Sequence, residues 1–195
     1  MRPLSKTHTS KAPLSKVRII SGKYKSRQIE FSGENNSTLR PTSDRLRETL
    51  FNWLMPYVVD ANCLDAFAGS GTLGFEALSR LAKSCDFFEL DVQAIKHLNS
   101  NKNKLNIENA TIYQRDVLTH LKTCDNYDVI FLDPPFSSDL LEQSLSSILS
   151  NVNINNDCVI YAEYASNNLP PSQSHFTILK RTKQGAVSAC LLQKS

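Results

Sequence analysis

The segment Leu64-Asp-Ala-Phe-Ala-Gly-Ser-Gly-Thr-Leu-Gly74 joins an apolar, strand-like run at 62–67 to the start of a helical pattern. Its glycines have the spacing G-x-G-x-x-G, which lets a backbone turn tightly and approach a nucleotide closely. Helical and strand-like patterns then alternate, at 72–82, 84–90, 92–105, 110–114, 117–121, 127–132 and 139–150. This order predicts an α/β fold, in which helices cover both faces of a parallel sheet.

The last part of the chain departs from this alternation. A strand predicted at 157–163 is followed by two strand-like runs, at 175–182 and 186–192, with only Lys183-Gln-Gly185 between them. Two strands joined by so short a turn must run antiparallel. The sequence therefore predicts a seven-stranded, mostly parallel sheet that ends in an antiparallel hairpin.

The N-terminal quarter predicts an extension to this main domain, which we place at 57–195. Residues 1–16 are basic and contain no acid, which indicates a disordered tail rather than a transit peptide, because they have no apolar helical face. Runs at 17–21 and 27–31 flank Gly22 and predict a short β-hairpin. Ser43 or Thr42 then caps a helix that ends before Pro56. We expect residues 17–56 to form the extension.

Composition is that of an ordinary globular protein: 195 residues, 41% hydrophobic and 21% charged, suffice for one good core. No apolar run approaches the ~20 residues of a membrane-spanning helix. The five cysteines are scattered and have no paired metal-ligand spacing, which indicates buried, reduced thiols in a cytoplasmic protein. We expect no metal, no membrane partner and a monomer.

Charge is distributed unevenly along the chain. Residues 1–47 hold eleven Lys or Arg and three acids, a net charge of +8, whereas the remainder holds eleven basic and sixteen acidic residues, a net charge of −5. A basic arm on an acidic body suits a polyanionic partner, with an affinity that falls as salt rises. A merely solvated tail is the alternative, although the basic residues continue into segments with folded patterns.

Four acids, Asp65, Glu89, Asp116 and Asp133, are predicted at the carboxyl ends of parallel strands, which meet at one crevice. Glu89 lies where a carboxylate holds the ribose hydroxyls of an adenosine. At ~6 Å and an effective dielectric constant of ~20, each unit-charge contact is worth roughly 3 kcal/mol. Three further carboxylates therefore disfavour a pyrophosphate and favour the cationic S-adenosylmethionine. Each acid taken singly also has a structural alternative to a role in binding. Asp65 could be a strand-end cap, Glu89 a solvated acid at the end of a strand, and Asp116 the N-cap of a helix.

The tetrapeptide Asp133-Pro134-Pro135-Phe136 closes the apolar run at 129–132. Its prolines fix φ near −65° and carry no N–H, so the carbonyl after Asp133 is held rigidly. The Asp133 carboxylate and the Pro134 carbonyl could accept both hydrogens of an exocyclic base amine, while Phe136 stacks on the base. The alternative is a proline turn, in which Asp133 caps a helix and Phe136 belongs to the core.

With these residues together, the chain resembles the bacterial small-subunit (16S) ribosomal RNA guanine-N2 methyltransferases, the RsmD-like family. The matching segments are 18–22, 39–54, 64–80, 130–136, 160–163 and the hairpin at 185–186, so the resemblance spans roughly residues 17–192. Its most specific part is the block Arg40-Pro-Thr-Ser-Asp-Arg-Leu-Arg-Glu48. Ser21 stands where the family usually has a second glycine, and Tyr24 where it often has tryptophan.

The resemblance implies a class I S-adenosylmethionine-dependent methyltransferase (Rossmann-like) fold. It implies S-adenosyl-L-methionine as donor, S-adenosyl-L-homocysteine as product, and one guanine 2-amino group as acceptor. The implied partner is small-subunit ribosomal RNA or the assembling small ribosomal subunit. The residues expected at the donor are Asp65, Phe67, Ala68, Gly69, Gly71, Glu89, Leu90, Asp116 and Val117. Those expected at the target base are Asp133, Pro134, Pro135 and Phe136.

Seven basic residues are expected to grip RNA phosphates near the target base. They are Arg18, Lys23, Lys25, Arg27, Arg40, Arg45 and Arg47. A structural ion pair is the alternative for Arg45 and Arg47, which lie on the predicted helix.

Two other functions share parts of this pattern. A DNA methyltransferase that acts on the adenine 6-amino group also uses Asp-Pro-Pro-Phe, but no separate sequence-reading domain is evident. A small NAD(P)-binding oxidoreductase, or a catalytically silent nucleotide-binding module, shares the glycine loop. No Tyr-x-x-x-Lys pair supports the oxidoreductase.

Overall fold

A computed structural model describes residues 14–32, 43–168, 170 and 175–195. Arg40 and residues 1–13 of the expected tail lie outside these ranges. The sheet contains β3 (Asn62–Asp65), β4 (Ser84–Phe88), β5 (Ala110–Tyr113), β6 (Val129–Leu132), β7 (Val159–Ala165), β8 (Phe176–Gln184) and β9 (Val187–Lys194). The helices that follow its strands are α3 (Thr72–Ser79), α4 (Val92–Leu105), α5 (Val117–Leu121) and α6 (Leu140–Ser150). The N-terminal elements are β1 (Leu14–Arg18), β2 (Gln28–Ser32), α1 (Asp44–Trp53) and α2 (Met55–Val58).

The seven strands of the large sheet have the order β5-β4-β3-β6-β7-β9-β8. Strands β3 to β7 pair in parallel, and β9 runs antiparallel to both β7 and β8. The predicted α/β architecture, with a mostly parallel sheet and an antiparallel hairpin at its end, is confirmed. The strand order reverses between β3 and β6, the kind of switch point at which open α/β sheets bind ligands.

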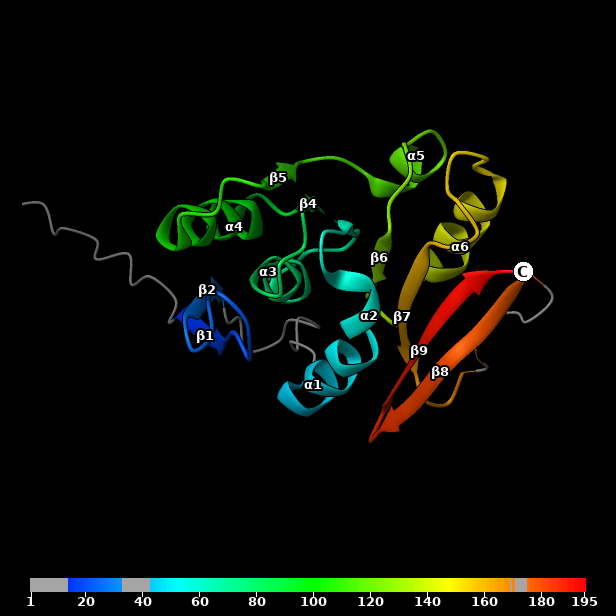
Figure 1. Ribbon diagram of the computed structural model, residues 1–195, viewed down its shortest axis with the longest axis horizontal. Helices are drawn as coiled ribbons and strands as arrows, with labels where there is room; N and C mark the ends of the chain where they lie inside the picture. Colours follow the sequence, from blue (N-terminus) through cyan, green and yellow to red (C-terminus); the bar gives the residue numbers. More distant parts are fainter. Residues whose placement is uncertain (1–13, 33–42, 169, 171–174) are drawn as a thin grey trace, which may run out of the picture.

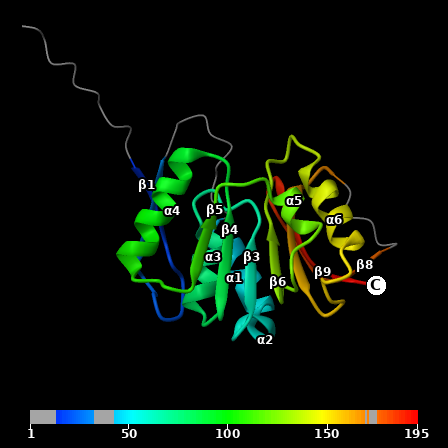
Figure 2. The same ribbon diagram turned by 90° about the horizontal axis from the view of Figure 1, so that it is seen from above.

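Alternate strand residues fill two hydrophobic clusters, one on each face of the sheet. On one face, Phe131 and Tyr161 pack in a cluster that includes residues of α1, α3 and α4. On the other face, Ile130 and Ile160 pack in a cluster with residues of α5 and α6. Figures 1 and 2 show these two layers on either side of the sheet. All five cysteines are buried and none forms a disulfide, as predicted.

The N-terminal hairpin packs against the main domain. Ile19 and Ile29 are fully buried, in the same cluster as the central strands. The prediction that a disordered tail extends to residue 16 was wrong, because β1 begins at Leu14. Lys16 lies opposite Glu30 in the register, and its ammonium is 3.4 Å from the Glu30 carboxylate. The acid on the facing strand thus offsets one of the positive charges of this basic stretch.

Two helix boundaries also follow from local chemistry. Ser43 caps α1, and its hydroxyl accepts the Leu46 N–H at 3.2 Å, as predicted. Helix α3 ends at Ser79, earlier than the predicted residue 82, because Leu81 has φ of 72°, a left-handed conformation that stops a helix. Among the described residues, no helix is long and apolar enough to cross a membrane.

Candidate active site at the carboxyl ends of the strands

A cavity of ≈ 930 Å³ lies at the carboxyl ends of β3, β4, β6 and β7. Its described lining includes segments 65–70, 88–91, 115–117 and 133–137, together with Glu163. A further wall is formed by Ser43 and Leu46 at the start of α1 and by residues 184–187, where β8 turns into β9. The glycine loop and the Asp133–Phe136 tetrapeptide therefore border one space.

The glycine loop is shaped by its backbone conformation and by close packing behind it. Gly69 and Gly71 have φ of 49° and 77°, in the left-handed region that favours glycine. A Cβ on Gly71 would lie 2.5 Å from Leu98 and 2.7 Å from Phe75. Gly69 lines the cavity, whereas Gly71 does not, so Gly71 shapes the loop from behind.

The carboxylate of Asp65 is buried beneath this loop, and the residue is only 2% exposed. It accepts the Gly74 N–H at 2.9 Å, which joins the end of β3 to the first turn of α3. Burial, and to a lesser degree the neighbouring charge of Glu89, raises the pKa of Asp65 to about 7, although the Gly74 hydrogen bond opposes this shift. The Asp65 side chain thus stabilises the conformation of the glycine loop and also borders the cavity.

Glu89 braces the other side of the loop. One oxygen of its carboxylate accepts the Gly69 N–H at 2.8 Å, and the other accepts the N–H groups of Leu90 and Asp91 at 2.7 and 2.8 Å. Leu90 is 64% exposed at the mouth of the cavity. The solvated-acid alternative for Glu89 is therefore wrong, because three backbone donors fix its carboxylate.

Asp116 both caps a helix and lines the cavity. Its side chain accepts the Leu118 N–H at 3.0 Å at the start of α5, and Val117 beside it is buried against the cavity. The N-cap alternative and the predicted place at the cavity therefore both hold for this residue. Asp91 caps α4 in the same way, through the Ala94 N–H at 2.7 Å.

The structure excludes the structural alternative for the tetrapeptide at 133–136. The N-cap of α6 is Asp139 rather than Asp133. Phe136 is 39% exposed and lines the cavity, so it does not belong to the core. Pro134 is buried and Pro135 exposed. An aromatic ring held at the rim of a cavity can stack on a planar ligand.

Glu163 also lines the cavity, although its position was not among the predicted site residues. It lies on β7, next to β6 in the sheet, and is only 3% exposed. The strand-end rule that selected Asp133 would have found it, since the strand predicted at 157–163 ends at Glu163 and β7 is parallel to β6. Arg115, an exposed residue of the lining whose guanidinium lies 5.9 Å from the Tyr113 ring centroid, was missed too.

Acidic residues dominate the described lining of this cavity. Its carboxylates come from Asp65, Glu89, Asp91, Asp116, Asp133 and Glu163, and its one described cationic side chain from Arg115. Such an excess of carboxylates favours a cationic ligand over a diphosphate. Among the described residues, no group of three or more His, Cys, Asp or Glu could hold a metal ion.

The expectation that Arg47 grips RNA is contradicted by its burial. Arg47 is 0% exposed, donates to the Arg18 carbonyl at 3.2 Å, and forms an ion pair with Asp44 at 2.5 Å. Arg45, two positions earlier on α1, is exposed. The alternative reading as a structural ion pair therefore holds for Arg47, because only its side of the helix faces the core.

The exposed residues Arg18, Lys23, Lys25 and Arg27 lie on the hairpin, but not beside the cavity. The turn between β1 and β2 packs on the end of α3 remote from the glycine loop, where the Lys23 N–H donates to the Ser79 carbonyl at 2.7 Å. Arg27 donates to the Lys104 carbonyl of α4 at 3.3 Å. Helix α3 spans about 12 Å, so these cations are separated from the mouth by roughly its length.

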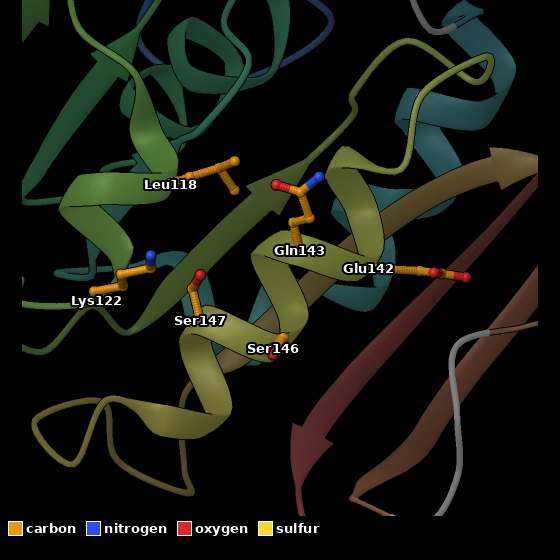
Figure 3. A pocket seen from close by; sticks show the side chains of 6 residues that line it. All are labelled: Leu118, Lys122, Glu142, Gln143, Ser146 and Ser147. Carbon is orange, nitrogen blue, oxygen red and sulfur yellow. The ribbon is translucent and has the colours of Figure 1, made fainter.

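A second, smaller cavity of ≈ 410 Å³ lies between α5 and α6 (Figure 3). Leu118 of α5 and Lys122, which follows α5, face Gln143 and Ser147 of α6 across it. None of the predicted site residues lines it.

Comparison with known proteins places this site in a family. The family model described as "Conserved hypothetical protein 95" matches residues 17–193. Ribosomal RNA small subunit methyltransferase D of Haemophilus influenzae is 43% identical over 182 residues, covering 91% of this chain and 93% of that protein. The protein of the same name from Escherichia coli K12 is 37% identical over 180 residues, covering 91% and 90%.

A solved structure from Escherichia coli, described as a methyltransferase, matches with a TM-score of 0.83 at 36% identity. The match covers 93% of this chain and 99% of that structure. Together with the strand order, this likeness confirms the predicted class I methyltransferase fold.

Proposed function

We propose that this chain, which belongs to the family described as conserved hypothetical protein 95, methylates the exocyclic 2-amino group of one guanine in small-subunit ribosomal RNA. The observation that carries the proposal is that the glycine loop, the carboxylates around it and the Asp133–Phe136 tetrapeptide all line one cavity. Relatives named as small-subunit ribosomal RNA methyltransferases support the class of reaction and of substrate.

The residues at the glycine loop fit S-adenosylmethionine as the methyl donor. Asp65 and Gly69 would border its methionine part, Glu89 its ribose hydroxyls, and Asp116 with Val117 its adenine. Leu90, exposed at the mouth, would supply an apolar face for the adenine ring. When bound, this donor supplies an activated methyl group on a sulfonium sulfur.

The chain's own residues hold the acceptor. The Asp133 carboxylate and the Pro134 carbonyl accept the two hydrogens of the amine, which directs the nitrogen lone pair toward the methyl group. Transfer is then a direct in-line displacement, with no covalent enzyme intermediate. This amine is too weak a base to be deprotonated first, so its proton leaves after the N–C bond forms, to Asp133 or water.

The target guanine must leave its stack to enter the cavity. Phe136 at the rim would stack on it, a contact worth roughly 1–3 kcal/mol. Arg45, beside the Ser43 and Leu46 wall, would grip phosphates close to the target, whereas Arg18, Lys23, Lys25 and Arg27 would contact RNA farther away. Arg40 stays in the proposal as well, although it lies outside the described residues.

Mapping methyl incorporation tests this function. Small subunits purified from cells that lack the protein are incubated with labelled S-adenosylmethionine and either the wild-type protein or its Asp133→Ala variant. We expect one N2-methylguanine in the small-subunit RNA with the wild type only. Label on an adenine, no label in the RNA, or label at the same level with both proteins would contradict the proposal.

A further inference from the structure

The proposed reaction requires the site to select guanine, and Glu163 has the chemistry to do so. Glu163 is 3% exposed, yet it borders the cavity that holds the tetrapeptide. A carboxylate that lines a ligand cavity can accept hydrogen bonds from a bound base, so its position makes Glu163 a candidate for base recognition.

The backbone places Glu163 beside Asp133. Strands β6 and β7 are parallel, and Leu132 pairs with Ala162 in the register. Asp133 directly follows Leu132 at the end of β6, and Glu163 directly follows Ala162 within β7, so the two residues lie at the same level of the sheet. Both belong to the lining of one cavity.

Tyr161 fixes the position of the Glu163 carboxylate. Its hydroxyl donates to Glu163 Oε1 at 2.6 Å, and its ring, 0% exposed, packs edge-on against Phe131 with centroids 6.4 Å apart. Burial and the charges of Glu163 and Asp133 raise the pKa of Tyr161, so the hydroxyl keeps the proton that it donates. An acceptor held by a packed side chain can discriminate between hydrogen-bonding patterns.

We infer that Glu163 reads the target base as guanine, by accepting its N1–H beside the amine that Asp133 and Pro134 hold. The Watson–Crick edge of guanine carries three N–H donors, one on N1 and two on N2. Three acceptors would meet them: the two carboxylates and the Pro134 carbonyl. Adenine presents an N1 lone pair at the equivalent place, which a carboxylate repels, so the same residue would reject adenine.

This inference rests on the proposed function. Substrates that carry 2-aminopurine allow the role of Glu163 to be tested separately from the methylation itself. That base has the 2-amino group of guanine but a lone pair on N1 instead of N1–H. RNA carrying either guanine or 2-aminopurine at the mapped position is ligated into the substrate. For each protein, kcat/KM on guanine is divided by kcat/KM on 2-aminopurine.

Glu163→Gln is the decisive variant, because its amide can present either an oxygen or an NH2 group to N1. We expect it to lower the guanine preference of the wild type by roughly ten- to a hundredfold, the range for one hydrogen bond to a charged group. Glu142→Gln is the matched control, since Glu142 is exposed on α6, and it should leave the ratio unchanged. An unchanged ratio in Glu163→Gln would overturn the inference.

Donor binding by calorimetry shows whether Glu163→Gln is folded. If it is not, Tyr161→Phe takes its place, because it keeps the packed ring and removes only the donor to Glu163. We expect a several-fold loss of guanine preference in that variant, and an unchanged ratio would again overturn the inference. A wild-type protein that methylates no guanine would instead overturn the proposed function itself.

Discussion

The guanidinium of Arg47 lies 3.8 Å from the carboxylate of Glu76, and both side chains are fully buried. Glu76 also accepts the backbone N–H groups of Ile20 and Ser21, at 2.7 and 3.1 Å, and the Nε–H of Arg80 at 2.8 Å. One carboxylate thus joins the N-terminal hairpin and α1 to α3, the helix that begins at the glycine loop.

Replacing Arg47 by Ala should destabilise the protein strongly. The variant removes a fully buried side chain, its hydrogen bonds to the Arg18 carbonyl and one of the two cations beside Glu76, at a cost of about 2–5 kcal/mol. Arg45→Ala, two positions away on the exposed side of α1, should change the free energy of unfolding by less than about 0.5 kcal/mol. Urea unfolding of both variants measures the difference. Equal midpoints and slopes would show that the buried pair contributes nothing.

Asp133→Ala should abolish methyl transfer and leave donor binding intact. The variant loses an acceptor for the target amine, whereas the glycine loop and Glu89 keep their hydrogen bonds. Asp139→Ala is the matched control, because Asp139 is exposed and makes no side-chain capping bond at α6. Methyl incorporation and donor calorimetry are measured on both variants. Wild-type turnover by Asp133→Ala would remove this residue from the mechanism.

The titration of Asp65 should make donor-free stability depend on pH. Its pKa is about 7 in the folded protein, above its ordinary value of 3.8, because burial disfavours the charged form. The folded state therefore holds a proton that the unfolded state has already released between pH ~4 and ~7, and stability falls as pH rises through that window. Asp65→Asn keeps an oxygen for the Gly74 N–H and removes the titration.

Without the donor, we expect Asp65→Asn to be more stable than the wild type at pH 8, by an amount that vanishes near pH 4. Thermal unfolding across this range checks the sign. Donor affinity should move in the opposite direction, because a cation binds the ionised carboxylate. The donor affinity of the wild type should rise as the pH approaches 7 and level off above pH 7. The donor affinity of Asp65→Asn should not show this rise. A pH-independent stability difference between the two proteins would contradict the raised pKa.

The hairpin cations should contribute to the salt dependence of RNA binding. For single-stranded RNA, log K falls with log salt by about 0.7 for each phosphate contact. Lys23→Ala combined with Lys25→Ala should therefore lower the slope by up to about 1.4, whereas Lys122→Ala, on the α5 side of the sheet, should not change it. Point substitutions are preferable to deleting the hairpin, which would leave the Glu76 carboxylate without two of its donors. Identical slopes would show that Lys23 and Lys25 do not contact RNA phosphates.

Much of the fold and part of the site are predictable from local sequence. Alternating patterns predicted the sheet and its antiparallel end. They also predicted the exact bounds of α4 and α5. The strand-end rule placed Asp65, Glu89, Asp116 and Asp133, which the structure brings to one cavity. These features follow from periodicity and chain direction, which are properties of neighbouring residues.

Other features depend on contacts between distant segments. Arg45 and Arg47 lie on one helix and have the same charge, but only Arg47 meets Glu76 in the core. The acidity of Asp65 depends on how deeply α3 and the glycine loop cover it. Glu163 becomes part of the site because β7 lies beside β6. The sequence by itself determined most of the helices and strands and the positions of the acids near the strand ends. The tertiary structure decided which charged side chains stabilise the fold and which line the cavity. It did so through burial and neighbouring charge, which depend on residues far apart in the chain.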